Sequence, residues 1–486
     1  MKLILNGNIN KIYVQGLALI FYHGVKFPEG EENTDGITLT VDVSELDNTV
    51  TCSATLTDGE REASFIASAI SENGESADRV YKIAVGQAVY RVGSELTGKT
   101  AGYGILTGIR PSKVAAEIIK SVGTDKAREI LVDRYLMSPD KAELCLAVAE
   151  NETRILSLTD DSKCSVYISI PFCPSRCTYC SFISCATKKL LSLIPEYLDK
   201  LCKEIKSTFE TARKCDLTVS CVYIGGGTPT ILTEKQLERL LSTVWDCVDV
   251  SALDEYTLEG GRPDTITDEK LIIAKKYGVS RISVNPQTMN DSILEKIGRK
   301  HTVKEFVSAF EKVKASGIPC INTDLIAGLD GDDYESFKRT VDSITDLDPD
   351  NVTVHSFCVK NASTVRAEDK DIYEKNDKMA IQSVDYSVKK LLSVGYIPYY
   401  MYRQKNTVGN SENVGYAKPH ALGLYNVFMM SDAHTVFGVG AGSTTKLVSH
   451  SDGEEKIQRI FSSKYPYEYL KDTKDTKELI KEFFRR

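Results

Sequence analysis

Three cysteines lie close together in one stretch of the sequence. Cys173, Cys177 and Cys180 form a C-x3-C-x2-C array directly after a short apolar run, and a fourth cysteine, Cys185, follows five residues later. Thiolates are soft ligands, and three of them on one loop suit either zinc or an iron–sulfur cluster. A structural zinc site would take four ligands that arrive as two separated pairs. Because no second C-x2-C pair occurs in the chain, the spacing favours a cluster with one iron free to bind a small molecule.

The other cysteines do not form a second array. Thirteen cysteines spread over 486 residues are not the pattern of a secreted disulfide framework. Apart from the array and Cys185, they stand singly, mostly in apolar or helical contexts. We expect each of these to be a buried small hydrophobic residue: Cys52, Cys145, Cys164, Cys202, Cys215, Cys221, Cys247, Cys320 and Cys358.

Composition narrows the class of protein. The chain is 42% hydrophobic and 26% charged, a composition typical of soluble globular proteins. Its net charge of -8, without a long Lys/Arg-rich patch, argues against a nucleic-acid partner. Polar residues interrupt the first apolar residues too early for a signal peptide. No apolar run approaches the roughly 20 residues that are needed to cross a bilayer. The sequence therefore predicts a cytoplasmic protein with no membrane span.

From residue 164 to about 380, strand-like runs alternate with amphipathic stretches such as 195–215 and 235–248. Alternating strands and helices predict a parallel sheet, and six such units predict an α/β fold with a full or partial (β/α) barrel. The strand-like runs are 166–170, 220–224, 255–259, 281–285, 320–326 and 351–357.

Three further segments flank the barrel region. Residues 1–85 predict a small α+β domain, and residues 86–160 predict a helical segment. Residues 161–380 would form the barrel, and residues 381–486 a smaller C-terminal domain. Within the first two segments we expect strands at 2–5, 18–22, 36–43 and 50–56, and helices that begin near Pro111, Thr124 and Ser138.

In barrels of this kind, catalytic and binding residues lie at the carboxyl ends of the strands. The first predicted strand leads into the cysteines, and the second leads into Gly225-Gly-Gly-Thr-Pro, whose glycines expose backbone groups. This run lacks the ending of a Walker loop and the spacing of a dinucleotide fingerprint. Beside an iron–sulfur cluster it suits the amino-acid end of S-adenosylmethionine, which offers an amine and a carboxylate to an open iron.

The later strand ends supply polar side chains. Glu259 could pair with the ammonium or ribose of that ligand, or it could form a salt bridge at the barrel mouth. Gln287, Arg299 and Asp324 would add further polar contacts, and the sixth strand ends at His355.

Several motifs together resemble a known family. The cysteine array with Tyr179, followed by Gly-Gly-Gly-Thr-Pro, resembles the radical SAM superfamily. Tyr167-Ile-Ser-Ile-Pro-Phe-Cys, Asp324-Leu-Ile-Ala-Gly-Leu and Gly438-Val-Gly-Ala-Gly-Ser resemble the oxygen-independent coproporphyrinogen III oxidase family. Within that family, three motifs are similar to the HemZ branch: Leu106-Thr-Gly-Ile-Arg-Pro, Glu259-Gly-Gly-Arg-Pro-Asp-Thr-Ile and Tyr402-Arg-Gln-Lys-Asn.

The resemblance implies a set of site residues. Cys173, Cys177 and Cys180 would ligate a [4Fe-4S] cluster, and Tyr179 falls at the family's aromatic position beside it. The positions that match the family's contacts to S-adenosylmethionine are Tyr167, Gly226, Gly227, Thr228, Glu259, Gln287, Arg299 and Asp324.

The resemblance also implies a reaction. A reduced flavodoxin or ferredoxin-type donor would supply one electron, and cleavage of S-adenosylmethionine would give a 5′-deoxyadenosyl radical. In the family this radical abstracts hydrogen from propionate side chains of coproporphyrinogen III. These side chains then lose carbon dioxide and become vinyl groups, a step of haem biosynthesis.

Two positions depart from the well-characterised oxidases. Phe182 stands where they carry a fourth cysteine, and Ser169 where they carry a histidine. Phenylalanine at position 182 is what the family's haem chaperones show, although their His-Asn-x-x-Tyr-Trp signature is not found here. Three functions therefore stay open: a porphyrinogen-oxidising enzyme, a haem-binding carrier, and a radical SAM enzyme that acts on another tetrapyrrole.

A tetrapyrrole substrate with carboxylates needs cationic partners. Arg262, Arg366 and Arg403 lie near predicted barrel ends or in the C-terminal region. Each could meet a substrate carboxylate, and each could instead be a solvated surface charge.

Overall fold

The computed structural model describes residues 1–28, 36–72, 74–180, 185–358, 370–404, 407–450, 455–473 and 475–485, with only the backbone over 370–375. These residues form two compact units. The first contains residues 1–150, 369–375 and 401–412, and the second contains residues 151–368, 376–400 and 413–486. The division into four domains, with boundaries after residues 85, 160 and 380, stays a prediction.

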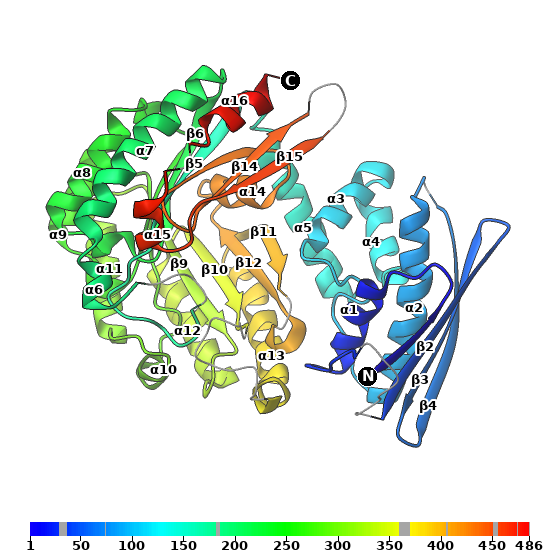
Figure 1. Ribbon diagram of the computed structural model, residues 1–486. Coiled ribbons are helices and arrows are strands. Elements are labelled where there is room, and N and C mark those ends of the chain that lie inside the picture. Colours follow the sequence, from blue (N-terminus) through cyan, green and yellow to red (C-terminus); the bar gives the residue numbers. More distant parts are fainter. Residues whose placement is uncertain are drawn as a thin grey trace. The chain divides into compact units, whose positions relative to one another are not determined.

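The first unit contains a four-stranded sheet, drawn in blue in Figure 1. β1 runs parallel to β2, whereas β2, β3 and β4 are antiparallel neighbours. Asp47 and Asn48 join β2 to β3 with φ angles of 49° and 61°, which a two-residue type I′ turn requires. The strands, in spatial order, are β1 (Lys2–Asn6), β2 (Ile37–Leu46), β3 (Thr49–Asp58) and β4 (Arg61–Ile70).

The strand predicted at residues 18–22 is wrong, because these residues belong to helix α1 (Lys11–Phe21) and its C-cap. Side chains such as Ile20 and Phe21 favour strands, but burial follows a helical period: Val14, Leu17, Ala18 and Phe21 are all buried. Asn10 begins the helix, since its side chain accepts a hydrogen bond from the Tyr13 N–H at 3.1 Å. Packing of the apolar face decided the element here, against the local strand preference.

Helix α2 (Ala77–Thr97) packs on β3 and β4 and against α1. Two glycines of α2 permit the close approach of α1. A Cβ atom added at Gly93 would overlap the ring of Phe21, and one added at Gly86 would overlap the Tyr13 hydroxyl. The helices predicted after α2 are confirmed as α3 (Pro111–Val122), α4 (Thr124–Asp133) and α5 (Pro139–Leu156).

The second unit is built on parallel strands, and all six strands predicted for the barrel are confirmed. Each strand pairs in parallel with the next along the chain. They are β5 (Lys163–Ile170), β6 (Thr218–Gly226), β7 (Glu255–Gly261), β8 (Arg281–Val284), β9 (Cys320–Ala327) and β10 (Asn351–Ser356).

Helices cover one face of these strands. In Figure 1, α7, α8, α9 and α11 lie side by side, and each contacts the next. The long helices are α7 (Ile194–Lys214), α8 (Glu234–Trp245), α9 (Asp268–Lys276), α11 (Val303–Ser316) and α12 (Tyr334–Leu347). The short helices of the second unit are α6 (Lys188–Leu191), α10 (Asp291–Lys296), η1 (Pro229–Ile231), η2 (Val250–Ala252) and η3 (Pro263–Thr265), whereas η4 (Val408–Asn410) belongs to the first unit.

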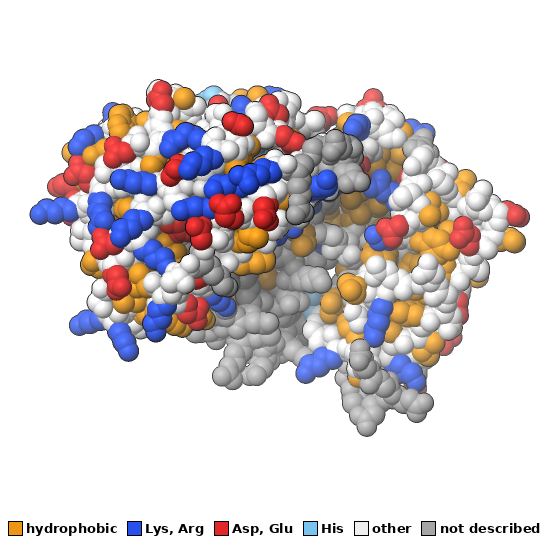
Figure 2. Space-filling model, turned by 45° about the horizontal axis from the view of Figure 1, so that its top comes forward, with side chains coloured by type: hydrophobic (Ala, Val, Ile, Leu, Met, Phe, Trp, Pro, Cys, Tyr) orange, Lys and Arg blue, Asp and Glu red, His pale blue; other side chains and the backbone are white. Residues whose placement is uncertain are grey.

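The outward faces of these helices carry charges of both signs. Ion pairs join Arg239 to Asp199 and Lys312 to Asp268, and basic and acidic side chains are interspersed on the face shown in Figure 2. Over the described part of the chain, no helix combines the length and the apolar character needed to cross a bilayer.

The C-terminal elements extend the same sheet at both of its ends. β12 pairs antiparallel with β10, and β13 pairs parallel with β5, which gives the order β11-β12-β10-β9-β8-β7-β6-β5-β13-β14-β15. The order among the described strands begins at β11 and ends at β15, which fits the partial barrel predicted. These elements are α13 (Lys370–Ser393), β11 (Ile397–Arg403), β12 (Glu412–Ala417), α14 (Leu424–Met430), β13 (Thr435–Val439), β14 (Thr444–Ser449), β15 (Lys456–Phe461), α15 (Pro466–Lys471) and α16 (Lys477–Phe484).

Alternate residues of the barrel strands differ in polarity. One set is mostly apolar, for example Val166, Ile168 and Ile170, as expected under a layer of helices. A parallel sheet covered on both faces is usually apolar on both, so a polar second face indicates an interior used for binding. This polar set comprises Ser165, Tyr167, Ser169, Tyr223, Glu255, Thr257, Glu259, Arg281, Ser283, Asn285, Asn322, Asp324, Asn351, Thr353 and His355.

The packing of α1 on α2 gives a stability prediction. Gly93→Ala should lower the free energy of unfolding by about 1–3 kcal/mol, because the added methyl group meets the buried ring of Phe21. Urea unfolding of the full chain measures the change.

The matched control is Gly16→Ala in α1, where the new Cβ would lie 3.4 Å from the Thr107 side chain, an ordinary contact. This variant should be neutral or more stable by up to about 1 kcal/mol, because alanine favours a helix over glycine. Equal destabilisation by both variants would contradict the close packing of α1 on α2.

Candidate functional site

The cysteine loop begins where β5 ends. Cys173 and Cys177 are buried and Cys180 is half-buried. The Cys173 N–H donates to the Cys185 carbonyl at 3.3 Å, and the Cys185 N–H donates to the Pro171 carbonyl at 2.9 Å. Cys185 therefore brings the chain back against the start of the loop. Residues 181–184, which include Phe182, lie outside the described residues.

The end of β6 supports Cys173. The Thr228 hydroxyl donates to the Cys173 sulfur at 3.4 Å, and the Thr228 N–H donates to the Phe172 carbonyl at 2.8 Å. A Cβ atom added at Gly227 would lie 2.6 Å from that carbonyl oxygen and 3.0 Å from the Cys173 sulfur. Only glycine at position 227 lets the two segments approach this closely, a role that the sequence analysis had not assigned to it.

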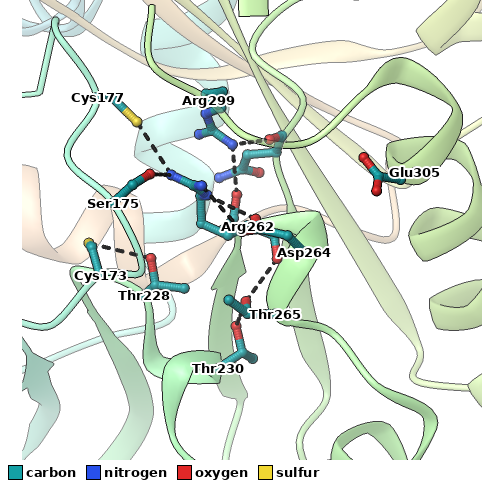
Figure 3. Close-up of polar contacts among 12 residues, drawn as sticks. Cys173, Ser175, Cys177, Thr228, Thr230, Arg262, Asp264, Thr265, Arg299 and Glu305 are labelled. Carbon is teal, nitrogen blue, oxygen red and sulfur yellow. Dashed lines mark hydrogen bonds and ion pairs between the residues drawn. The ribbon is translucent and has the colours of Figure 1, made fainter. Parts of the chain in front are cut away.

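Arg262, which follows β7, contacts Cys177 (Figure 3). Its Nη1 atom donates to the Ser175 hydroxyl at 3.1 Å and to the Cys177 sulfur at 3.6 Å. Its Nε and Nη2 atoms donate to the two carboxylate oxygens of Asp264 at 3.0 and 3.3 Å. The residue is 4% exposed, so the expectation of a surface charge is wrong, and its guanidinium is already paired inside the protein.

Two other arginines, Arg403 and Arg366, were candidates for binding substrate carboxylates. Arg403 is 5% exposed, donates to the Asn410 side chain at 2.8 Å, and lies over the Tyr103 ring at 4.5 Å. It is therefore not a surface charge either. Arg366 lies outside the described residues.

Two carboxyl groups lie at the strand ends on the polar face. The Gly226 N–H donates to Glu259 at 3.2 Å, and the Asn285 side chain donates to Asp324 at 2.7 Å. Burial and then repulsion by Asp324 raise the pKa of Glu259 to about 8, although the Gly226 N–H opposes the shift. Burial is also the main reason that the pKa of Asp324 is raised. Burial therefore favours the neutral form of both carboxyl groups in the absence of a cationic partner.

Arg299 ties the cysteine loop to two strand ends. Its Nε and Nη2 atoms donate to the Tyr179 hydroxyl at 3.3 and 3.2 Å. Its Nη1 atom donates to the Asn285 carbonyl at 2.7 Å and to the Gly261 carbonyl at 3.3 Å. Arg299 is 8% exposed, so in this structure it holds Tyr179 and the backbone in place.

Gln287 lies after β8 in an unusual backbone conformation. Its φ angle is 72°, in the left-handed region that non-glycine residues rarely adopt. Its backbone exchanges hydrogen bonds with the Asp324 carbonyl at 3.1 Å and the Ile326 N–H at 2.9 Å. Its side-chain Oε1 atom is buried and has no hydrogen-bond partner among the described residues. An unpaired buried acceptor is costly, so it marks a place where a ligand donor would fit.

Three tyrosines stack on the polar face. The rings of Tyr167 and Tyr223, on adjacent strands, have centroids 6.0 Å apart, and Tyr425 of α14 lies 6.2 and 4.5 Å from them. Of the three tyrosines, only Tyr167 was predicted from the sequence. The pairing of β5 with β6 could have indicated Tyr223, whereas no sequence signal indicates Tyr425, because α14 comes much later in the chain.

The donor set fits a cluster better than a single ion. Among the described His, Cys, Asp and Glu side chains, no three converge closely enough to hold one metal ion between them. A zinc ion needs that convergence, whereas in a cluster each thiolate binds a different iron. Burial raises the pKa of Cys173 to about 12, so its thiolate needs positive charge beside it, which iron would supply.

Comparison with known proteins places this geometry in a family. The sequence model of the radical SAM superfamily matches residues 167–344. The chain is 32% identical over 466 residues to the oxygen-independent coproporphyrinogen-III oxidase-like protein HemZ of Bacillus subtilis (strain 168), covering 94% of this chain and 92% of HemZ. It is 37% identical over 199 residues to the heme chaperone HemW of the same organism, covering 40% of this chain and 51% of HemW.

Among solved structures, coproporphyrinogen III oxidase (HemN) from Escherichia coli, described as a radical SAM enzyme, matches with a TM-score of 0.46 and 20% identity. That match covers 61% of this chain and 67% of HemN.

The similarity to HemZ runs over nearly the whole of both chains, and the superfamily implies an iron–sulfur cluster and S-adenosylmethionine. The chain therefore belongs to the radical SAM superfamily and, within it, to the family of oxygen-independent coproporphyrinogen-III oxidase-like proteins that includes HemZ.

Proposed function

We propose that the chain binds a [4Fe-4S] cluster through Cys173, Cys177 and Cys180 and uses it to cleave S-adenosylmethionine. The radical would serve the oxygen-independent oxidative decarboxylation of coproporphyrinogen III to protoporphyrinogen IX in haem biosynthesis. The observation that carries the proposal is that the segments after β6 and β7, together with Arg299, hold the cysteine loop. Thr228 and Arg262 contact its sulfurs, and Arg299 holds Tyr179.

The protein's part is to hold and shield the cofactors. Three cysteines leave one iron of a four-iron cluster without a protein ligand, and S-adenosylmethionine would bind there. When bound and reduced by a flavodoxin or ferredoxin-type donor, the cluster supplies the electron that cleaves S-adenosylmethionine to a 5′-deoxyadenosyl radical. Burial of Cys173 and Cys177 would keep water from the loop.

The strand ends offer groups that match S-adenosylmethionine. The backbone of Gly226 and Gly227, with Thr228, lies beside Cys173, where the amino-acid end of the ligand would bind. Glu259 and Asp324 lie at the strand ends, and once ionised their carboxylates would accept hydrogen bonds from the ammonium and the ribose. The unpaired Oε1 of Gln287 would accept another hydrogen bond, and Tyr167 would offer an aromatic face.

Similarity to HemZ over 94% of this chain supports the porphyrinogen reaction. A second candidate, haem carriage, is favoured by the similarity to HemW, which covers 40% of this chain. An anaerobic reaction with reductant, S-adenosylmethionine and coproporphyrinogen III distinguishes the two functions. Vinyl products with 5′-deoxyadenosine, detected by mass spectrometry, support the enzyme. Stoichiometric haem binding without turnover of either compound supports the carrier.

The cysteine assignment predicts the effect of single substitutions. Cys173→Ala, Cys177→Ala and Cys180→Ala should each abolish the iron–sulfur chromophore and reduce bound iron and sulfide to background after anaerobic reconstitution, because two thiolates do not hold the cluster. A normal cluster in any of these three variants would show that the substituted cysteine is not a ligand.

Cys185→Ala is the matched control, since Cys185 is also buried and only its backbone is hydrogen-bonded to the start of the loop. It should retain the full cluster and the cleavage of S-adenosylmethionine. Loss of the cluster in this variant would mean that four cysteines bind it, which would leave no iron for S-adenosylmethionine.

The raised pKa of Glu259 predicts a pH dependence of ligand binding. Below about pH 8 the Glu259 carboxyl is mostly protonated, and it must lose its proton to form an ion pair with the ammonium group of S-adenosylmethionine. Affinity for S-adenosylmethionine should therefore rise about tenfold per pH unit up to about pH 8 and then level off. Anaerobic titration calorimetry of the cluster-loaded protein measures this slope.

Glu259→Gln should bind S-adenosylmethionine weakly and with little pH dependence below pH 8. Glu295→Gln, at an exposed position on α10, should behave as the unmodified protein does. If the slope persists unchanged in Glu259→Gln, another group takes up the proton and the role assigned to Glu259 is wrong.

A further inference from the structure

Arg262 is a cationic side chain that donates a hydrogen bond to a cysteine of the array. Its Nη1 atom lies 3.6 Å from the Cys177 sulfur, and the bond to Ser175 anchors the same atom to the loop at 3.1 Å. The two hydrogen bonds to Asp264 orient the guanidinium plane. Figure 3 shows the guanidinium between Ser175, Cys177 and Asp264. Ser175 and Asp264 therefore fix the guanidinium in the position from which it contacts Cys177.

The backbone around Arg262 is also held. The Arg262 carbonyl accepts hydrogen bonds from the Thr265 N–H at 3.1 Å and the Thr265 hydroxyl at 2.9 Å. The Thr265 hydroxyl lies 2.6 Å from that of Thr230, which follows β6. The arginine thus stands on a short turn that is joined to the neighbouring strand end, and its position does not depend on the cysteine loop alone.

The charge near Cys177 is positive on balance. Arg262 and Arg299 are both buried, and Asp264 is the carboxylate that forms an ion pair with Arg262. His301, 3% exposed, adds no charge at neutral pH, because burial and then the two arginines lower its pKa to about 4. One carboxylate against two guanidiniums leaves a positive field that water screens poorly.

A positive group at a ligand sulfur changes the redox balance of a cluster. Reduction adds one electron, so the reduced state gains more from a nearby cation and from a hydrogen bond to sulfur than the oxidised state does. The bond from Arg262 is charge-assisted, whereas the bond from Thr228 to Cys173 comes from a neutral hydroxyl and is expected to be weaker.

We propose that Arg262 is a positioning residue that raises the reduction potential of the cluster by donating a charge-assisted hydrogen bond to the Cys177 sulfur. The inference rests on the proposed function, in which Cys177 binds one iron. The step it affects is the transfer of one electron from a reduced flavodoxin or ferredoxin-type donor to the cluster. The donor is oxidised, the cluster is reduced, and no bond is formed or broken in the protein. Arg262 would make this electron transfer more favourable.

The test compares Arg262→Gln, Arg262→Lys and the double variant Arg262→Gln/Asp264→Asn, which avoids leaving a buried carboxylate unpaired. Iron and sulfide content are measured first. The midpoint potential is then measured by anaerobic titration followed by electron paramagnetic resonance, without S-adenosylmethionine. Arg239→Gln is the matched control, because it removes a positive charge from an exposed position on α8.

We expect Arg262→Gln and the double variant to hold a full cluster whose reduction is at least about tenfold less favourable, a shift of ~59 mV to lower potential for one electron. Arg262→Lys, which keeps the charge without the planar fork, should shift less. Arg239→Gln should not shift.

Two outcomes overturn the proposal. One is a full cluster with an unchanged potential in Arg262→Gln and in the double variant. The other is loss of the cluster in all three Arg262 variants, which would show that the arginine only holds the loop together. A parent protein that takes up no cluster at all would overturn the proposed function, and this inference with it.

Discussion

Polar side chains on the inner face of β5–β10 must find partners inside the protein, because burying an unpaired polar group costs free energy. Toward the amino ends of the strands, Glu255 pairs with Arg281 at 3.5 Å and accepts from Thr257 at 2.9 Å. The Nη1 of Arg281 and the Oδ1 of Asn351 have no hydrogen-bond partner among the described residues. Toward the carboxyl ends the compensation is also incomplete. Glu259 has a raised pKa, and the Oε1 of Gln287 has no partner among the described residues. The carboxyl ends differ in that the segments after β6 and β7 hold the cysteine loop there.

The cysteine loop depends on the same strand ends. A loop of this kind has little regular structure of its own, so rigid elements must hold its donor atoms in place. β6 does so through Gly227 and Thr228, and the turn after β7 does so through Arg262. Arg299 completes the support through Tyr179. Two of these contacts come from the segments after β6 and β7, and Arg299 is itself bonded to the carbonyls of Gly261 and Asn285, which explains why the loop needs the assembled sheet.

The C-terminal elements complete the site's surroundings. β13 lies beside β5, and the Ser169 hydroxyl donates to the Ala441 carbonyl at 2.8 Å. The Tyr197 hydroxyl is bonded both to the Ser169 carbonyl and to the Ala441 N–H, at 2.9 Å each. The glycine-rich motif at 438–443 therefore packs against the strand that leads to the cysteines. Serine at position 169 therefore has a structural partner in the C-terminal region.

The sequence by itself determined the strand–helix alternation, the six parallel strands, and the motifs at their ends, because hydrophobic periodicity and residue spacing are local properties. The same local signals misassigned residues 18–22, where packing of α1 on the glycines of α2 outweighs strand preference. Only the tertiary structure showed that Arg262 contacts Cys177 and that Tyr425 stacks on Tyr223. These contacts join residues far apart in the chain. Their formation depends on strand order and on burial, which no spacing along the sequence encodes.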